Sequence, residues 1–157
     1  MQFSPQNLLR QLKAAFRKSS AVEVYTDGSS KNGFGSWAYV ISRRGECLAE
    51  NSGRVRGANS NRMEFQAAIE ALHSLPENSK ITLFSDSRIL VDAMTSGDGP
   101  AAHQNQMDEL LKLNEKNKIT WQWVKAHNGN LYNERCDELC ILARTQKNGT
   151  TSFLATE

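Results

Sequence analysis

The sequence predicts an α/β domain in which helices flank a mixed β-sheet, and three observations support this fold class. The chain has 157 residues, which suits one compact domain. Short runs with the alternating pattern of strands come first, and helical patterns alternate with single strands afterwards. Their order, βββαβααβα, is typical of a sheet that begins as an antiparallel meander and continues through parallel crossover connections.

Each element follows from its local pattern. Trp37, Tyr39 and Ile41 alternate on one face of the second strand, and Arg43-Arg44-Gly45 is typical of a hairpin turn. The strands are expected at 22–26, 35–41, 47–55, 81–84 and 119–124. The helices are expected at 62–75, 88–94, 104–116 and 134–144, with a Gly/Pro-rich break at 97–100.

An amphipathic basic segment precedes the first strand. Leu8, Leu12 and Phe16 fall on one helical stripe, whereas residues 1–22 contain four basic side chains and no acid. Three interpretations remain open: a helix that docks on the domain, an arm that binds nucleic acid, or an organelle-targeting segment. The expected organisation is an N-terminal helix at 1–20, a main domain at 21–145 and a C-terminal tail at 146–157.

Composition limits where the protein works. No apolar run approaches the roughly 20 residues of a membrane-spanning helix, so no membrane association is expected. The three cysteines lack the further Cys or His pair of a zinc site and should stay reduced in the cytoplasm, or in an organelle matrix if the first segment is a targeting signal. Basic residues outnumber acids between residues 31 and 62, so this part of the domain would meet a polyanion.

Four acidic residues stand at or inside otherwise apolar elements. Asp27 and Asp86 end predicted strands, Glu64 shares the sheet-facing stripe of the first main helix, and Asp137 lies in the last helix. Each has a structural explanation when taken alone. These explanations are a turn at Asp27, a capping box of Asn61 with Glu64, a helix N-cap at Asp86, and the favourable dipole of a first helical turn for Asp137.

Taken together, the four acids predict a metal site. The two strands that end in Asp27 and Asp86 should aim both side chains at the edge where open α/β sheets bind ligands. Clustered carboxylates repel one another unless cations neutralise them, and hard oxygen ligands suit Mg²⁺ or Mn²⁺. We therefore expect a divalent metal to be bound by Asp27, Glu64, Asp86 and Asp137.

Two further features lie near the end of the last strand. His127 follows it in a segment rich in Gly and Asn, where a histidine beside a metal could move protons, although a lone loop histidine is commonly plain surface. Trp121 and Trp123 alternate on one face of that strand, which favours core packing over stacking on bases.

These residues carry a resemblance to type 1 ribonuclease H over about residues 22–144. Four motifs occur in the family's order: Tyr25-Thr26-Asp27-Gly28-Ser29, Asn61-Arg62-Met63-Glu64-Phe65-Gln66-Ala67-Ala68, Ser85-Asp86-Ser87, and Trp123-Val124-Lys125-Ala126-His127 with Asn133-Glu134-Arg135-Cys136-Asp137-Glu138-Leu139. The resemblance implies a five-stranded mixed sheet flanked by helices. It also implies a monomeric endoribonuclease that cuts the RNA strand of an RNA/DNA hybrid and leaves 5′-phosphate and 3′-hydroxyl ends.

The resemblance further implies roles for the acids. Two Mg²⁺ ions about 4 Å apart would activate water and stabilise the leaving oxygen, and Mn²⁺ should substitute. Asp27 would bridge both ions, Glu64 and Asp86 would complete one site, and Asp137 the other. His127 would assist proton transfer or product release.

Candidate substrate contacts come from the same motifs. Gly28 and Ser29 would bring backbone close to the cut strand, and Asn61 would lie near the 2′-hydroxyls that distinguish RNA from DNA. Arg62 and Arg88 complete this set, the latter at a place where a glutamine is common.

The sequence departs from the best-known bacterial members in lacking their lysine- and tryptophan-rich protrusion, which we expect the basic N-terminal helix to replace. Two alternative functions remain open: a non-catalytic module that binds RNA/DNA hybrid, and another nuclease of the same superfold.

Overall fold

The computed structural model describes residues 6–7, 10, 21–146 and 151–153. Within the predicted N-terminal helix, Gln6, Asn7 and Arg10 are helical. The rest of that segment, and residues 147–150 and 154–157 of the predicted tail, lie outside the described residues. The division of the chain at these two ends therefore stays a prediction.

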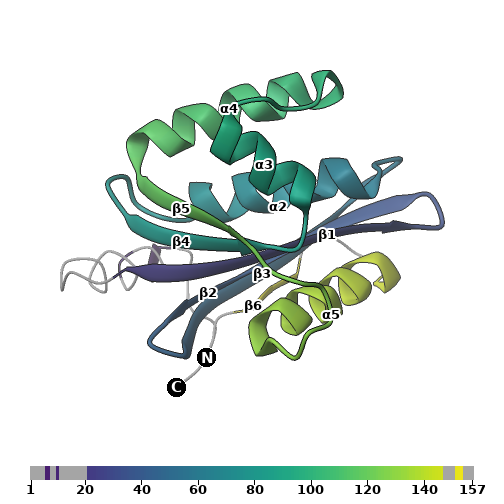
Figure 1. Ribbon diagram of the computed structural model, residues 1–157. Coiled ribbons are helices and arrows are strands. Elements are labelled where there is room, and N and C mark those ends of the chain that lie inside the picture. Colours follow the sequence, from purple (N-terminus) through teal and green to yellow (C-terminus); the bar gives the residue numbers. More distant parts are fainter. Residues whose placement is uncertain (1–5, 8–9, 11–20, 147–150, 154–157) are drawn as a thin grey trace.

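The described residues form one mixed sheet with the strand order β5-β4-β1-β2-β3-β6 (Figure 1). Its strands are β1 (Val22–Lys31), β2 (Phe34–Arg43), β3 (Glu46–Arg56), β4 (Lys80–Ser85), β5 (Lys118–Trp123) and β6 (Thr151–Phe153). The strands β1, β2 and β3 pair antiparallel, whereas β4 pairs parallel with both β1 and β5. The predicted meander, the parallel crossovers and the five expected strands are thus confirmed. The short β6, which the sequence did not predict, adds a sixth strand beside β3.

Helices cover the two faces of the sheet unequally. The helices are α2 (Ser60–His73), α3 (Arg88–Ser96), α4 (Gln104–Lys116) and α5 (Leu131–Thr145), with a short 3-10 turn at Ala101–His103 before α4. In Figure 1, α2, α3 and α4 lie on one face and α5 lies on the other, where it is the only helix among residues 21–146. None of the helices in the described part of the chain combines the length and apolarity needed to cross a membrane.

The core divides between these two faces. Trp37, Tyr39 and Ile41 pack in the larger cluster beneath α2, as their alternation predicted, while Ala38 and Val40 pack against α5. Trp121 packs against the larger cluster, and its indole N–H donates to the Asn114 side chain at 3.0 Å. Core packing of this tryptophan is therefore confirmed.

Tight turns set the register of the meander. Asn32 and Gly33 have φ of 54° and 80°, and Arg44 and Gly45 have φ of 51° and 81°. Two consecutive residues with positive φ match the right-handed twist of the flanking strands, as in type I′ hairpins. The predicted turn at 43–45 is confirmed.

Gly28 lies where β1 comes closest to α2. A Cβ atom at this position would overlap the backbone of Met63 and Glu64, with 2.8 Å to the Glu64 Cα. Only a residue without a side chain permits this approach. The approach brings the start of α2 directly over the middle of β1.

We predict that Gly28→Ala destabilises the fold by about 3 kcal/mol or more, because the new methyl group meets backbone that cannot rotate away. Urea unfolding followed by circular dichroism measures this loss. The Ser30→Ala change, on the exposed end of the same strand, should alter stability by less than about 0.5 kcal/mol. Equal stability of the two variants would contradict the close contact.

Candidate active site

Three carboxylates meet at one end of the sheet. Asp27 lies on β1, Glu64 lies on α2, and Asp86 directly follows β4. Each offers one oxygen, and these oxygens lie within 4.8 Å of one another. The parallel register pairs Thr26 with Ser85. The residues that follow them, Asp27 and Asp86, therefore lie side by side. The contact at Gly28 brings Glu64 to the same place.

Helix capping explains none of the three. The N-cap of α2 is Asn59, whose side chain accepts from the Arg62 N–H at 2.9 Å, so the capping box of Asn61 with Glu64, considered as an alternative, does not form. The N-cap of α3 is Ser87, which accepts from the Leu90 N–H at 3.2 Å, so the N-cap role considered for Asp86 is also wrong. Their carboxylates remain available for chemistry.

The last helix also begins earlier than predicted. Its N-cap is Asn130, which accepts from the N–H groups of Tyr132 and Asn133. Asp137 is therefore the seventh residue of α5, beyond the first turn, and the dipole explanation for this acid does not apply.

Burial and mutual repulsion dominate the electrostatics of the cluster. Asp27 and Glu64 are each only 7% exposed. Burial, followed by the charges of Asp86 and Asp137, raises the pKa of Asp27 to about 7. Burial, followed by the charges of Asp27 and Asp86, raises the pKa of Glu64 well above its ordinary value. At neutral pH the cluster therefore holds protons when no cation is bound.

Opposing effects act on the pKa of Asp86, which is raised overall. Burial raises the pKa of Asp86, while a hydrogen bond from the Asn133 side chain and the nearby His127 lower it. The Gly28 N–H lowers the pKa of both Asp27 and Glu64 by hydrogen-bonding their carboxylates, although burial keeps both values raised. One Glu64 oxygen, Oε2, is buried without a partner among the described residues.

Asp137 and His127 lie on the α5 side of the cluster. The charge of Asp137 acts on both Asp27 and Asp86, although this carboxylate is outside the group of three. A hollow of about 470 Å³ opens beside it and is lined by His127, Leu131, Glu134, Arg135, Asp137 and Glu138. His127 is exposed and has a φ of 52°. The structure thus brings the histidine and four acids into one region.

The candidate substrate contacts surround this region with different exposure. Gly28 is buried against α2, and Ser29 accepts from the Arg144 guanidinium. Asn61 and Arg62 are exposed in the first turn of α2.

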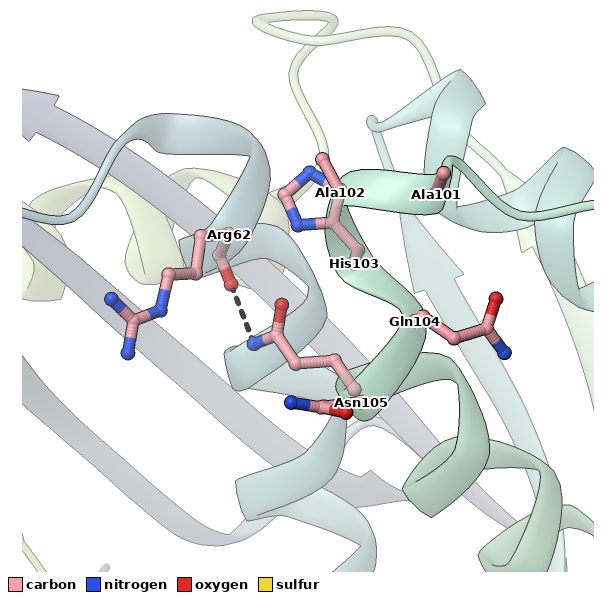
Figure 2. A pocket seen from close by; sticks show the side chains of 7 residues that line it. Arg62, Ala101, Ala102, His103, Gln104 and Asn105 are labelled. Carbon is pink, nitrogen blue, oxygen red and sulfur yellow. Dashed lines mark hydrogen bonds between the residues drawn. The ribbon is translucent and has the colours of Figure 1, made fainter.

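A second hollow lies between the start of α2 and the start of α4. It has a volume of about 480 Å³ and is lined by Arg62 and residues 101–106 (Figure 2). The Gln106 side chain donates to the Arg62 carbonyl at 3.1 Å, which is the dashed line in Figure 2. The ring of His103, one of its lining residues, stacks on Phe65 with 4.9 Å between centroids. Nothing in the local sequence of His103 signals this stacking.

Trp123 and Arg88 form a stacked pair beside Asp86. The Arg88 guanidinium carbon lies 3.7 Å from the centre of a Trp123 ring, and the indole N–H donates to the Asp86 carbonyl at 3.1 Å. Arg88 is exposed. The sequence interpretation assigned Trp123 to the core, whereas the structure shows that it supports both a cation and the backbone of the acid.

Asn133 is the other residue that the sequence interpretation left without a role. It stands one helical turn before Asp137, a spacing that could have signalled a shared helix face. Its side chain reaches Asp86.

The thiols of α5 lie behind the same strand. All three cysteines, which fall within the described part of the chain, are free, as expected. Cys140 donates from Sγ to the Asp27 carbonyl at 3.6 Å, and Cys136 donates to the Tyr25 carbonyl at 3.3 Å. Burial raises the pKa of both thiols, so they stay protonated and pack as small apolar groups.

Comparison with known proteins agrees with this geometry. The sequence model of the family described as RNase H matches residues 19–145. Ribonuclease H of Campylobacter jejuni (strain 81-176) is 41% identical over 128 residues, which cover 75% of this chain and 87% of the relative.

Two solved structures show the same fold. LC9-RNase H1, a type 1 RNase H with the type 2 active-site motif, has a TM-score of 0.71 at 22% identity and covers 86% of this chain and 78% of its own. LC11-RNase H1, solved in complex with an RNA/DNA hybrid, has a TM-score of 0.67 at 17% identity and covers 79% of this chain and 99% of its own.

The fold and the acidic cluster place the chain among the hydrolases that cut nucleic acid with the help of bound metal. The chain belongs to the ribonuclease H family. The residues present fit such a metal, because the clustered ligand atoms are all carboxylate oxygens and one buried oxygen, Glu64 Oε2, lacks a partner among the described residues.

We predict that the metal-free protein loses stability as the pH rises from about 4 to 8. The raised pKa of Asp27 means that the folded state holds a proton which the unfolded chain releases at lower pH, so the stabilising protonated form is lost as the pH passes about 7. Thermal melting in chelator across this range measures the loss.

The Asp27→Asn variant serves as the comparison for this prediction. It removes the charge, so its melting temperature in chelator at pH 8 should exceed that of the wild type, with a difference in unfolding free energy of a few kcal/mol. A wild-type melting temperature that stayed constant or rose between pH 5 and 8 in chelator would contradict the crowding of acids.

Proposed function

We propose that the protein hydrolyses internal phosphodiester bonds in the RNA strand of RNA/DNA hybrids, using two Mg²⁺ ions, and leaves 5′-phosphate and 3′-hydroxyl ends. The observation that carries this proposal is the convergence of three carboxylate oxygens within 4.8 Å of one another at the end of β1 and β4. Support also comes from the ribonuclease H relatives and from LC11-RNase H1, which was solved with such a hybrid.

A catalytic role explains the cluster better than binding alone. A module that only bound nucleic acid would gain nothing from buried acids facing phosphate, because they repel the ligand and raise one another's pKa. The same acids become useful when they hold divalent cations.

The four acids take the part of metal ligands in this proposal. Asp27 would contribute to holding both ions, Glu64 and Asp86 would help to hold one of them, and Asp137 would help to hold the other. When bound, the ions supply an activated water and stabilise the leaving oxygen. In the hydrolysis, a water oxygen would bond to phosphorus and release a proton to solvent, the bond from phosphorus to the 3′ oxygen would break, and that oxygen would take up a proton.

Other residues orient the substrate and move protons. His127 is exposed and close enough to affect the pKa of Asp86, so it can carry a proton to or from solvent. Asn61 and Arg62, exposed at the start of α2, would contact the hybrid near the 2′-hydroxyls and phosphates. Gly28 is buried, so it would not contact the hybrid directly. The backbone of the next residue, Ser29, would approach the cut strand in its place.

We also propose that the protein acts as a monomer in the cytoplasm, where its three free thiols would stay reduced.

We predict that internally labelled RNA annealed to DNA is cut at internal positions with Mg²⁺ and not with chelator, while single-stranded and duplex RNA stay intact. Asp27→Asn should lower kcat by roughly a thousandfold, because loss of the metal's charge stabilisation is worth several kcal/mol. Gel analysis of the products measures both effects. Binding of hybrid without cutting would favour the hybrid-binding module, and cutting from the 3′ end would favour another nuclease of this fold.

Arg88 is proposed as a phosphate contact. The guanidinium lies over a Trp123 ring, the residue is exposed, and no carboxylate partner of Arg88 is found among the described residues. An arginine held in this way binds phosphate with less loss of side-chain freedom. Its position two residues after Asp86 supports a contact with the strand that is cut.

We predict that Arg88→Gln weakens hybrid binding about tenfold, equivalent to roughly 1.4 kcal/mol, and reduces the salt dependence by about one phosphate contact. Fluorescence anisotropy of labelled hybrid in chelator at several salt concentrations measures both. Lys80→Gln, which removes the same charge at the exposed start of β4, the end opposite Asp86, should change neither. Equal effects of the two substitutions would show that only net charge matters.

A further inference from the structure

Asn133 is a buried polar residue without a capping role. It is only 4% exposed, and it lies in α5 between the N-cap Asn130 and Asp137. Its backbone N–H is satisfied by the Asn130 side chain. Its own side chain takes no part in that cap, and it reaches across to Asp86, which follows β4. A buried polar side chain in a helix is less stabilising than an apolar one of the same size unless its hydrogen bonds are made.

The chemistry of the contact fixes how the amide is oriented. A carboxylate only accepts hydrogen bonds, so the NH₂ group of Asn133 must face Asp86. This hydrogen bond is the largest effect that opposes the rise in the pKa of Asp86. The amide oxygen, Oδ1, then points elsewhere, and it is buried without a hydrogen-bond partner among the described residues.

A second unsatisfied oxygen belongs to the same neighbourhood. Glu64 Oε2 is also buried without a partner in the described part of the chain, and Glu64 interacts with Asp86 as well. A buried acceptor left unpaired costs on the order of 1–3 kcal/mol. Two such acceptors around one carboxylate indicate that the complete site contains a further hydrogen-bond donor. Mg²⁺ usually keeps several of its waters, which are strong donors.

We infer that Asn133 is a positioning residue of the metal centre, whose amide nitrogen holds the Asp86 carboxylate in place and whose Oδ1 accepts a hydrogen bond from a water bound to the metal. This inference rests on the metal site of the proposed function. It adds a residue that does not itself bind the ion but orients one that does, and such outer partners commonly change metal affinity by 10- to 100-fold.

The chain offers a matched control in the same helix. Asn130 caps α5 through its side chain, three residues before Asn133. The Asn130→Ala change removes the cap and destabilises the same helix, but it leaves the amide of Asn133 and the Asp86 carboxylate in place. A loss of metal affinity that came only from a weaker α5 would therefore appear in both variants.

The test variant is Asn133→Leu, which keeps a similar shape and removes both polar groups. Leucine favours helix and buries well, so the metal-free protein should melt at the same temperature as the wild type or higher. Its affinity for Mn²⁺, measured by the loss of the free-ion EPR signal, should fall about tenfold. Its kcat on hybrid at low Mg²⁺ should fall similarly and recover at high Mg²⁺, with KM for hybrid little changed.

The outcomes separate this inference from the proposed function. An Asn133→Leu protein that binds Mn²⁺ within twofold of the wild type, or a wild type that binds none, overturns the role of Asn133. The same holds if Asn130→Ala loses as much affinity. If the Leu variant does not fold, Asn133→Ala is measured in its place against the same limits. A wild type whose Mn²⁺ affinity depends on Asn133 as expected, but which does not cut hybrid, would overturn the proposed function and leave this inference standing.

Discussion

Repulsion among buried carboxylates is the constraint on which the rest of this structure depends. Asp27 and Glu64 are nearly buried, and with Asp86 they present oxygens within 4.8 Å of one another. Isolated acids would avoid this arrangement, so the fold must hold them there. Parallel pairing of β1 with β4 sets the two aspartates side by side, and the contact at Gly28 holds the α2 backbone against β1. The energy that offsets this crowding comes from the large cluster beneath α2, which includes Met63 and Phe65 on either side of Glu64.

The single helix on the opposite face completes the site from behind. α5 is tied to the sheet by a two-point ion pair of Arg135 with Glu50, at 2.8 and 3.0 Å, and by the thiols of Cys136 and Cys140 beneath β1. These contacts fix the rotation of α5 about its axis. The same rotation directs Asn133 and Asp137 toward the acids of β1 and β4. The packing of α5 therefore decides both the charge and the geometry of the metal site.

Positive charge near the cluster comes from two arginines, Arg88 and Arg62. The Arg88 guanidinium lies over a Trp123 ring, and the same indole donates a hydrogen bond to the Asp86 carbonyl, so one aromatic residue connects a phosphate-binding candidate with a proposed metal ligand. Arg62 lines a separate hollow at the start of α2 and α4. Both arginines are exposed, and the Arg88 guanidinium lies over a Trp123 ring, which supports their proposed contact with phosphate.

The order of strands and helices could be predicted because alternation and helical periodicity report which side chains are buried, as with Trp37, Tyr39 and Ile41. The starts of the helices were harder to predict from the sequence. Asn59, Asn61, Ser87 and Asp86 are all chemically able to cap, and only the backbone angles of the finished turns select Asn59 and Ser87. The strand β6 was missed because three residues carry too little pattern, and its existence depends on the free edge of β3.

The sequence alone determined the identity of the acids, the α/β class and the side of the sheet on which ligands gather, because these follow from residue type and the direction of strands. Tertiary structure decided how close the acids lie, how far their pKa values rise, and which neighbours support them. Those properties depend on distance and burial between residues as remote as Asp86 and Asn133, and no local pattern encodes them. Trp123 shows the same limit, since its alternation predicts burial and says nothing of the arginine on its face.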